Sequence, residues 1–311
     1  MSRRPKIIAR DFCASFVSHV LLRRCPALVN TFYENLPHRW LSFLVGHGFF
    51  GTPESSFPWH VTLKNGKRLN LTVDPRDAFS IGYAIHYKHH DVGLRRVQEY
   101  LIDRMGPSSV YLDIGSNIGV SSVYALSCGR TCWLFEPNTA LRPFVEKLFA
   151  GNGYNTAVFE DVALSDSTGE AEFFISSSSF LSSFDQKHAA SDGDVSRVRV
   201  PLRTLDSYLP ELTAAASEIV IKIDVEGHEM AVLRGGVETL TRYRPPLMIE
   251  LLDDAAPRTA AFSFMKSIGY ECQGIVNAPR MTLQQMPSLA DVLAFRDINF
   301  LFVPAEGPRR A

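Results

Sequence analysis

The sequence predicts an α/β fold built on a doubly wound sheet, and two observations support this prediction. From Val110 onward, short apolar runs alternate with segments of helical periodicity, which is typical of parallel strands joined by crossover helices. The first run ends in an Asp-led turn with two glycines, at 113–119, and the second run ends in Glu136. Ligands of doubly wound sheets bind at such strand ends. The same pattern therefore predicts the position of a site.

The elements can be assigned in order along this main domain. Strands are expected at 110–114, 132–135, 157–162, 219–224, 247–251, 270–276 and 299–303. Helices are expected at 92–105, up to about residue 127, at 139–149, at 228–240 and at 262–268. An insertion at 169–209, with a β-run at 171–175, separates the third strand from the fourth.

Residues 1–105 are expected to form an N-terminal extension, followed by the main domain at 106–311. Asn65-Gly66 lies between two alternating runs within 61–73, and this dipeptide accepts positive φ at both central turn positions, so a β-hairpin is predicted. The helical stripe at 92–105 ends at Gly106-Pro107, which marks the boundary.

An apolar stretch at 12–22 lies between basic residues near the N-terminus. It is far shorter than the roughly 20 residues needed to span a bilayer, and no small-residue cleavage site of a secretion signal follows it. Apolar residues recur there at near-helical spacing, so we expect an amphipathic helix that docks on protein. Contact with a membrane surface is the alternative.

The composition gives no general reason to bind nucleic acid, because 32 Lys and Arg oppose 33 Asp and Glu, for a net charge of −1. The five cysteines include no pair with the CxxC spacing of a zinc or redox site. A reducing, cytoplasmic location is the simplest interpretation.

The turn after the first strand does not fit a dinucleotide. A nicotinamide-binding turn has the pattern GxGxxG, whereas here Gly115 and Gly119 stand four apart and Asp113 precedes them. S-adenosylmethionine carries an ammonium and a sulfonium instead of a phosphate, and an Asp beside exposed backbone groups suits those charges. Asp113, Gly115, Ser116, Asn117 and Gly119 are therefore candidate cofactor-binding residues. The alternative is a tight turn whose Asp caps the helix.

The second strand ends in Glu136-Pro137, and a carboxylate at that place can accept two hydrogen bonds from ribose hydroxyls. Strand-end acids are common, but an Asp-led glycine turn followed at this distance by a strand-end Glu is a more specific pair. After the third strand, Asp161 and Val162 are candidates for the adenine amino group and ring. A surface turn is the alternative for those two residues.

The fourth strand carries ionisable side chains to the same edge of the sheet, namely Asp224, Glu226, His228 and Glu229. They are candidate catalytic residues, because they would face the methyl group and bind or deprotonate a substrate hydroxyl. Lys222 is expected to pair with an acid such as Glu250. An acid-and-His cluster also suits Mg²⁺, although no metal ligand is assigned, and a helix N-terminus decorated with acids is a further alternative.

Together these segments resemble the FkbM family of methyltransferases over about 110–250. The resemblance rests on LDIGSNIG at 112–119, FEPN at 135–138, VALSDSTGEAEF at 162–173, VPLRTLDSYL at 200–209, KIDVEGHEMAVLRGG at 222–236 and RPPLMIE at 244–250. It implies a Rossmann-like, seven-stranded sheet whose last strand is antiparallel, and O-methylation of a sugar or polyketide hydroxyl. It does not extend to the residues before Val61.

The predicted function is therefore methylation by S-adenosylmethionine of a hydroxyl on a sugar, glycan or polyketide-type small molecule. Two alternatives remain open. A nicotinamide-dependent oxidoreductase would need the phosphate-binding turn that this sequence lacks. A non-catalytic module would bind the cofactor without consuming it.

Overall fold

The structure is a computed structural model that describes residues 56–74, 79, 80, 83, 87, 91–176, 182–190 and 194–305. The helix expected at 12–22, and with it the choice between docking on protein and contact with a membrane surface, lies outside these residues. Within the described ranges, every helix is too short or too polar to cross a bilayer.

The described part of the chain divides into two compact units, and the first combines the described residues before Asp91 with Phe144–Gly153. In this unit β1 (Phe57–Thr62) and β2 (Arg68–Val73) pair antiparallel. A hairpin therefore occupies the predicted region, but its first strand begins earlier than expected. Gly66 has a φ of 80°, whereas Asn65 has no positive φ, because the turn is longer than two residues.

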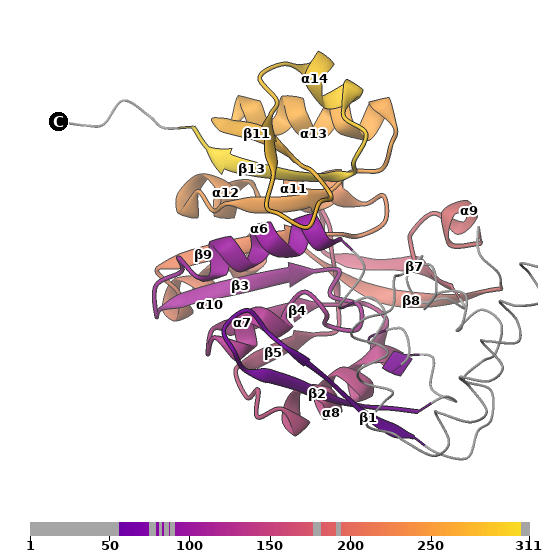
Figure 1. Ribbon diagram of the computed structural model, residues 1–311. Helices are drawn as coiled ribbons and strands as arrows, with labels where there is room; N and C mark the ends of the chain where they lie inside the picture. Colours follow the sequence, from indigo (N-terminus) through magenta and orange to yellow (C-terminus); the bar gives the residue numbers. More distant parts are fainter. Residues whose placement is uncertain are drawn as a thin grey trace, which may run out of the picture. The chain divides into compact units, whose positions relative to one another are not determined.

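The second unit, Asp91–Pro143 with Tyr154 onward, contains the main sheet (Figure 1). The strand order is β12-β11-β13-β10-β9-β3-β4-β5. The bounds are β3 (Ser109–Ile114), β4 (Thr131–Phe135), β5 (Ala157–Glu160), β9 (Glu218–Ile223), β10 (Leu247–Glu250), β11 (Tyr270–Ile275), β12 (Leu283–Gln285) and β13 (Asn299–Pro304). The five adjacent strands β10, β9, β3, β4 and β5 are parallel to one another. Strand β13 is antiparallel to both of its neighbours, β10 and β11. The expectation of seven strands was wrong, because β12 adds an eighth by pairing with β11.

Apolar side chains on both faces explain why the central strands are buried. All six residues of β3 are buried, as are five of the six in β9. Such continuous apolar runs are typical of parallel strands covered by helices on both faces. The core includes Leu112, Ile221, Ile249, Phe300 and Phe302.

The helices are α6 (Val92–Ile102), α7 (Val123–Ser127), α8 (Arg142–Gly151), α9 (Gln186–Ala189), α10 (Leu209–Ala215), α11 (Glu229–Arg234), α12 (Val237–Tyr243), α13 (Ala255–Ser267) and α14 (Leu289–Ala294). Although α6 was expected in the N-terminal extension, it belongs to the second unit. Its Gln98 donates to the Tyr111 hydroxyl at 2.6 Å and to the carbonyl of Ser121.

The single helix expected at 228–240 is two helices, α11 and α12, separated at Gly235 and Gly236. A β-carbon on Gly235 would lie 1.9 Å from the carbonyl oxygen of Ser165. The break therefore occurs where two stretches of backbone touch.

A second sheet of three strands, two of which lie in the insertion, has the order β6-β8-β7. Its strands are β6 (Ala163–Leu164), β7 (Gly169–Ser176) and β8 (Val195–Arg203), and β7 pairs with β8 antiparallel along its whole length. The segment Ser182–Ala190, which includes α9, attaches to β7 through reciprocal backbone hydrogen bonds between Ser183 and Phe174.

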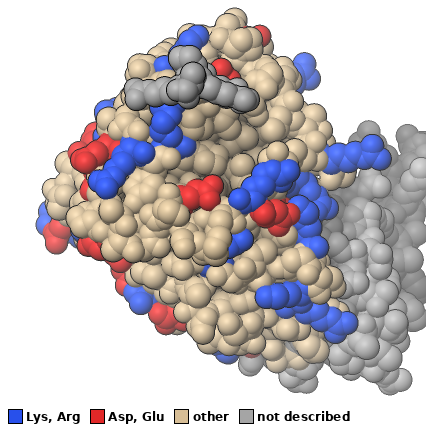
Figure 2. Space-filling view, turned by 90° about the vertical axis from the view of Figure 1, so that its left-hand side faces the viewer, with Lys and Arg blue, Asp and Glu red and all other residues tan. Residues whose placement is uncertain are grey.

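Charged side chains of both signs are interspersed on the face drawn in Figure 2. This arrangement agrees with the nearly equal totals of 32 basic and 33 acidic residues.

Candidate active site

The turn after β3 has an unusual backbone conformation. Gly115 and Gly119 both have a φ of 75°, and Asn117 has a φ of 47°. Glycine adopts this left-handed region without steric penalty, and Asn tolerates it better than most residues. The turn therefore needs these residue types at these positions.

Hydrogen bonds fix this turn between the ends of two neighbouring strands. The N–H groups of Gly115 and Ser116 donate to the carbonyl oxygen of Phe135 at 3.0 and 3.2 Å. On the other side, a β-carbon on Gly115 would lie 1.8 Å from the carbonyl oxygen of Asp224. The Asp-led turn, the end of β4 and the loop after β9 thus form one continuous edge.

Glu136 is held by the backbone on both sides of its carboxylate. One oxygen accepts the Asn117 N–H at 2.9 Å and the other accepts the Asn138 N–H at 2.9 Å. Burial raises the pKa of Glu136 to about 7, against the opposing effect of these two donors. The residue is still partly exposed, as is Pro137 beside it. Each carboxylate oxygen has a second lone pair, so each can still accept a hydrogen bond from a hydroxyl group.

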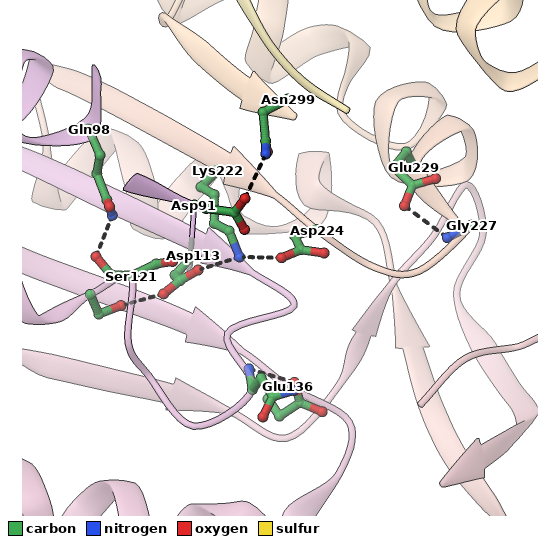
Figure 3. Close-up of polar contacts among 12 residues, drawn as sticks. Asp91, Gln98, Asp113, Ser121, Glu136, Lys222, Asp224, Gly227, Glu229 and Asn299 are labelled. Carbon is green, nitrogen blue, oxygen red and sulfur yellow. Dashed lines mark hydrogen bonds and ion pairs between the residues drawn. The ribbon is translucent and has the colours of Figure 1, made fainter. Parts of the chain in front are cut away.

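Asp113 lies at the end of β3, and its side chain has no exposed surface. Its carboxylate accepts the Ser122 hydroxyl at 2.7 Å and lies 3.7 Å from the Lys222 ammonium (Figure 3). Burial raises the pKa of Asp113, whereas Lys222 and Ser122 lower it. This carboxylate therefore lies in the interior beneath the turn, where it contacts Ser122 and lies near Lys222.

Lys222 is a buried cation between two acids. Its ammonium lies 3.0 Å from Asp224 and 3.7 Å from Asp113, so its close partners are these residues and not the expected Glu250. Burial alone would lower the pKa of Lys222, but the charges of Asp224 and Asp113 outweigh it and the pKa is raised. Lys222 thus links the buried acid to the exposed edge.

Three carboxylates converge at the ends of β9 and β10. Oxygens of Asp224, Glu226 and Glu250 all lie within 4.8 Å of one another. Burial, followed by the charge of Asp224, raises the pKa of Glu226 to about 7 and that of Glu250 to about 10. Glu250 therefore carries a proton at neutral pH. Three oxygens at this spacing could also hold a hard cation.

The two other residues of the predicted catalytic set are occupied elsewhere. His228 lies 3.0 Å from the Ser165 hydroxyl and its ring centroid is 4.4 Å from that of Phe184. Burial lowers its pKa. Glu229 is buried and accepts the Gly227 N–H at 2.9 Å, at the start of α11. The structure thus brings Asp224 and Glu226 together with Glu250, but it leaves His228 and Glu229 outside that group.

His188 contacts the site, although no sequence motif indicated it. Its Nε2 lies 2.8 Å from a carboxylate oxygen of Glu226. Ser183 also reaches this residue, donating its hydroxyl to the Glu226 carbonyl at 2.7 Å. Both residues come from the insertion, 38 and 43 positions before Glu226, so no short motif could have indicated the contact.

The residues expected near adenine follow β5. Asp161 is paired with Arg142 at 2.7 Å, and both side chains are about two-fifths exposed, at 41% and 38%. Val162 is buried and packs in the main core. Asp161 therefore lies at the surface beyond the end of β5, whereas the side chain of Val162 lies in the protein interior.

The sequence of this chain matches a known protein family. Residues 113–272 match the family model described as the Methyltransferase FkbM domain. No curated protein sequence matches the chain.

Solved structures show only distant similarity. The methyltransferase FkbM of Methylobacillus flagellatus is 14% identical, with a TM-score of 0.41, over 73% of this chain and 55% of that one. The chain thus spans little more than half of that protein. Precorrin-6y C5,15-methyltransferase of Geobacter metallireducens is 11% identical, with a TM-score of 0.39, over 70% of this chain and 90% of that one. A SAM-dependent O-methyltransferase of Thermotoga maritima is 6% identical, with a TM-score of 0.36, over 86% and 83%.

Proposed function

Because this chain belongs to the FkbM methyltransferase domain family, we propose that it is a cytoplasmic methyltransferase that uses S-adenosylmethionine. The acceptor is a hydroxyl group on a sugar, glycan or polyketide-type small molecule. The observation that carries the proposal is the geometry of Glu136, whose partly exposed carboxylate stands at the end of β4, beside the glycine turn.

Glu136 fits the ribose of this cofactor. Two backbone N–H groups fix its orientation, and the free lone pairs of its oxygens can accept both ribose hydroxyls. In this proposal the cofactor contacts four residues of the turn after β3, namely Gly115, Ser116, Asn117 and Gly119. It also contacts Pro137 after β4. Asp161 and Val162 are proposed for the adenine, with Asp161 as the hydrogen-bonding residue.

The cationic end of the cofactor requires a different residue from the one expected. Asp113 has no exposed surface, so its role is to hold Lys222 and the turn in place. Asp224 is 29% exposed and lies at the same edge. We therefore propose that Asp224 and backbone carbonyl groups of the turn contact the positively charged groups of the cofactor.

Acceptor chemistry is assigned to the group formed by Asp224, Glu226 and Glu250. When bound, S-adenosylmethionine supplies a methyl group made electrophilic by its sulfonium. Glu226 orients the acceptor hydroxyl and takes its proton, and a pKa of about 7 suits a base at neutral pH. Most of the remaining work is alignment of the two substrates.

Titration calorimetry tests the cofactor assignment. We expect S-adenosylhomocysteine, the demethylated product, to bind with micromolar or tighter affinity, and NAD to bind far more weakly. Tight NAD binding without S-adenosylhomocysteine binding would favour the oxidoreductase.

Mass spectrometry tests the catalytic assignment. Metabolite and glycan extracts incubated with methyl-labelled S-adenosylmethionine should gain label at oxygen in the presence of the protein. Binding without any transfer would indicate the non-catalytic module. EDTA is the matched control for a bound cation: loss of transfer that Mg²⁺ restores would assign the three carboxylates to a metal, and indifference to EDTA supports a direct role for Glu226.

A further inference from the structure

Glu226 has a backbone conformation that it does not favour by itself. Its φ is 52°, in the left-handed region, and it is one of four non-glycine residues with positive φ in the described chain. Such conformations cost of order 1–3 kcal/mol and persist only where the surroundings hold them. Residues in contact with Glu226 should therefore stabilise this backbone conformation.

Ser183 holds the backbone of Glu226. Its oxygen accepts the Asp185 N–H at 3.1 Å, which orients the hydroxyl so that it donates to the Glu226 carbonyl at 2.7 Å. Ser183 is itself fixed by the reciprocal backbone bonds to Phe174 on β7. The small sheet is thereby connected to the loop that follows β9.

His188 holds the side chain of the same residue. Its Nε2 is 2.8 Å from the Glu226 carboxylate, and the two side chains are 25% and 19% exposed. It lies on α9, whose first turn is capped by Asp185 through the Lys187 N–H at 2.8 Å. Backbone and carboxylate of Glu226 are thus both set by one short segment, Ser182–Ala190.

We propose that Ser183 and His188 are positioning residues for methyl transfer, which direct the Glu226 carboxylate toward Asp224 and Glu250 and hence toward the acceptor. This inference rests on the proposed function and adds a role for the insertion, which the sequence motifs leave unassigned. His188 acts through Glu226. It does not itself contact the residues proposed for the cofactor, which lie after β3, β4 and β5 and at Asp224 after β9.

A double-mutant cycle tests this proposal. The variants are His188→Ala, Glu226→Gln and the two combined, with His188→Gln as the conservative variant, because a Gln amide can replace the Nε2–H donor. Lys187→Ala is the matched control, since this side chain lies on the same helix, α9, and is exposed. Ser183→Ala tests the backbone contact independently.

Three measurements are made on each full-length variant. They are the initial rate of label transfer from methyl-labelled S-adenosylmethionine into extract, the dissociation constant of S-adenosylhomocysteine, and the thermal midpoint without ligand. We expect His188→Ala to slow transfer roughly tenfold, which is less than the about 10²- to 10⁴-fold loss expected on removing the base itself. His188→Gln should recover most of the rate, and Ser183→Ala should also slow transfer. The dissociation constant should stay within about twofold of wild type in the Ser183 and His188 variants, because these two side chains contact Glu226 and not the residues proposed to hold the cofactor.

The cycle distinguishes the outcomes. In the Glu226→Gln background, His188→Ala should cause no further loss of rate, and the thermal shifts should be non-additive as well. Equal slowing in both backgrounds, or a wild-type rate for His188→Ala, overturns the proposal while the methyltransferase assignment stands. If the wild-type protein neither binds S-adenosylhomocysteine nor transfers label, the proposed function fails and this role fails with it.

Discussion

Gly115 and Asp224 are in backbone contact, since a β-carbon on Gly115 would lie 1.8 Å from the Asp224 carbonyl oxygen. The contact joins the turn of the proposed cofactor site to the loop that carries the acceptor acids. We predict that Gly115→Ala destabilises the protein by at least about 3 kcal/mol in urea unfolding, the range of severe single substitutions.

Gly129→Ala is the matched control for this substitution. Gly129 has the same φ of 75°, but its β-carbon would have nothing within 4 Å. Ala at that position should cost about 1 kcal/mol for the backbone conformation alone. Equal losses in the two variants would mean that the contact with Asp224 contributes nothing.

Removing the Glu136 carboxylate should weaken cofactor binding. Glu136→Ala eliminates up to two charge-assisted hydrogen bonds to the ribose, each worth about 1.5–3 kcal/mol. We expect the dissociation constant of S-adenosylhomocysteine, measured by calorimetry, to rise by roughly tenfold or more. Asp166→Ala removes an exposed carboxylate that pairs with Arg234 and should leave the constant unchanged. An unaltered constant for Glu136→Ala would exclude that residue from the ribose site.

Loss of Lys222 should leave an uncompensated charge in the interior. We predict that Lys222→Met destabilises the protein by about 3–5 kcal/mol, because Asp113 is fully buried and loses its cation. Asp113→Asn in the Lys222→Met background should recover part of this loss. If the double variant is no more stable than Lys222→Met, the charge of Asp113 is not the cause.

Arg258 should be highly sensitive to substitution. It is 1% exposed on α13 and donates to the carbonyl oxygens of five residues: Leu251, Leu252, Val292, Phe295 and Asp297. Arg258→Lys cannot reproduce this planar set of donors, and each buried acceptor left unpaired costs about 1–3 kcal/mol. We expect a loss of at least about 3 kcal/mol in urea, against less than about 0.5 kcal/mol for the exposed Arg242→Lys.

The stability of the protein should fall as pH rises because of Glu250. Burial, and then the charge of Asp224, raises its pKa from 4.5 to about 10. Between these values the folded state retains a proton that the unfolded state has lost, so stability decreases as pH increases through this window. Glu250→Gln keeps the shape without the charge. It should exceed wild type in urea resistance at pH 8 and differ little from it at pH 5.

An exposed carboxylate on β11 serves as control for that pH dependence. Glu271→Gln should change urea resistance little at either pH, because this side chain is exposed. An equal gain at pH 8 for both variants would point to overall charge and not to the group at the end of β10.

Strand positions were predictable because buried parallel strands form continuous apolar runs with clear ends. Seven strands of the main sheet lie close to their predicted positions, including β13. The three-residue β12 carries no such run and was missed. The break between α11 and α12 was missed because its cause, contact of Gly235 with Ser165, is a tertiary contact.

The site was predictable only at the level of which loops meet. The motifs placed Asp113, Glu136 and Asp224 at one edge of the sheet, because parallel strands end together. They did not reveal that Asp113 has no exposed surface. Nor could they indicate His188, since its partner lies 38 residues further along the chain and only folding joins them.

The position of β13 between β10 and β11 affects how the chain completes its fold during synthesis. A nascent chain that has left the ribosome only as far as Ser288 exposes unpaired edges on both β10 and β11. Unpaired edges are templates for association with other chains, and partly synthesised chains are prone to it. Glu250, at the end of β10, pairs with Asn299 on β13. It can therefore gain this neighbour only after Asn299 has been synthesised. Emergence of β13 from the ribosome should therefore cover both strand edges at the same step that completes the sheet beside Glu250.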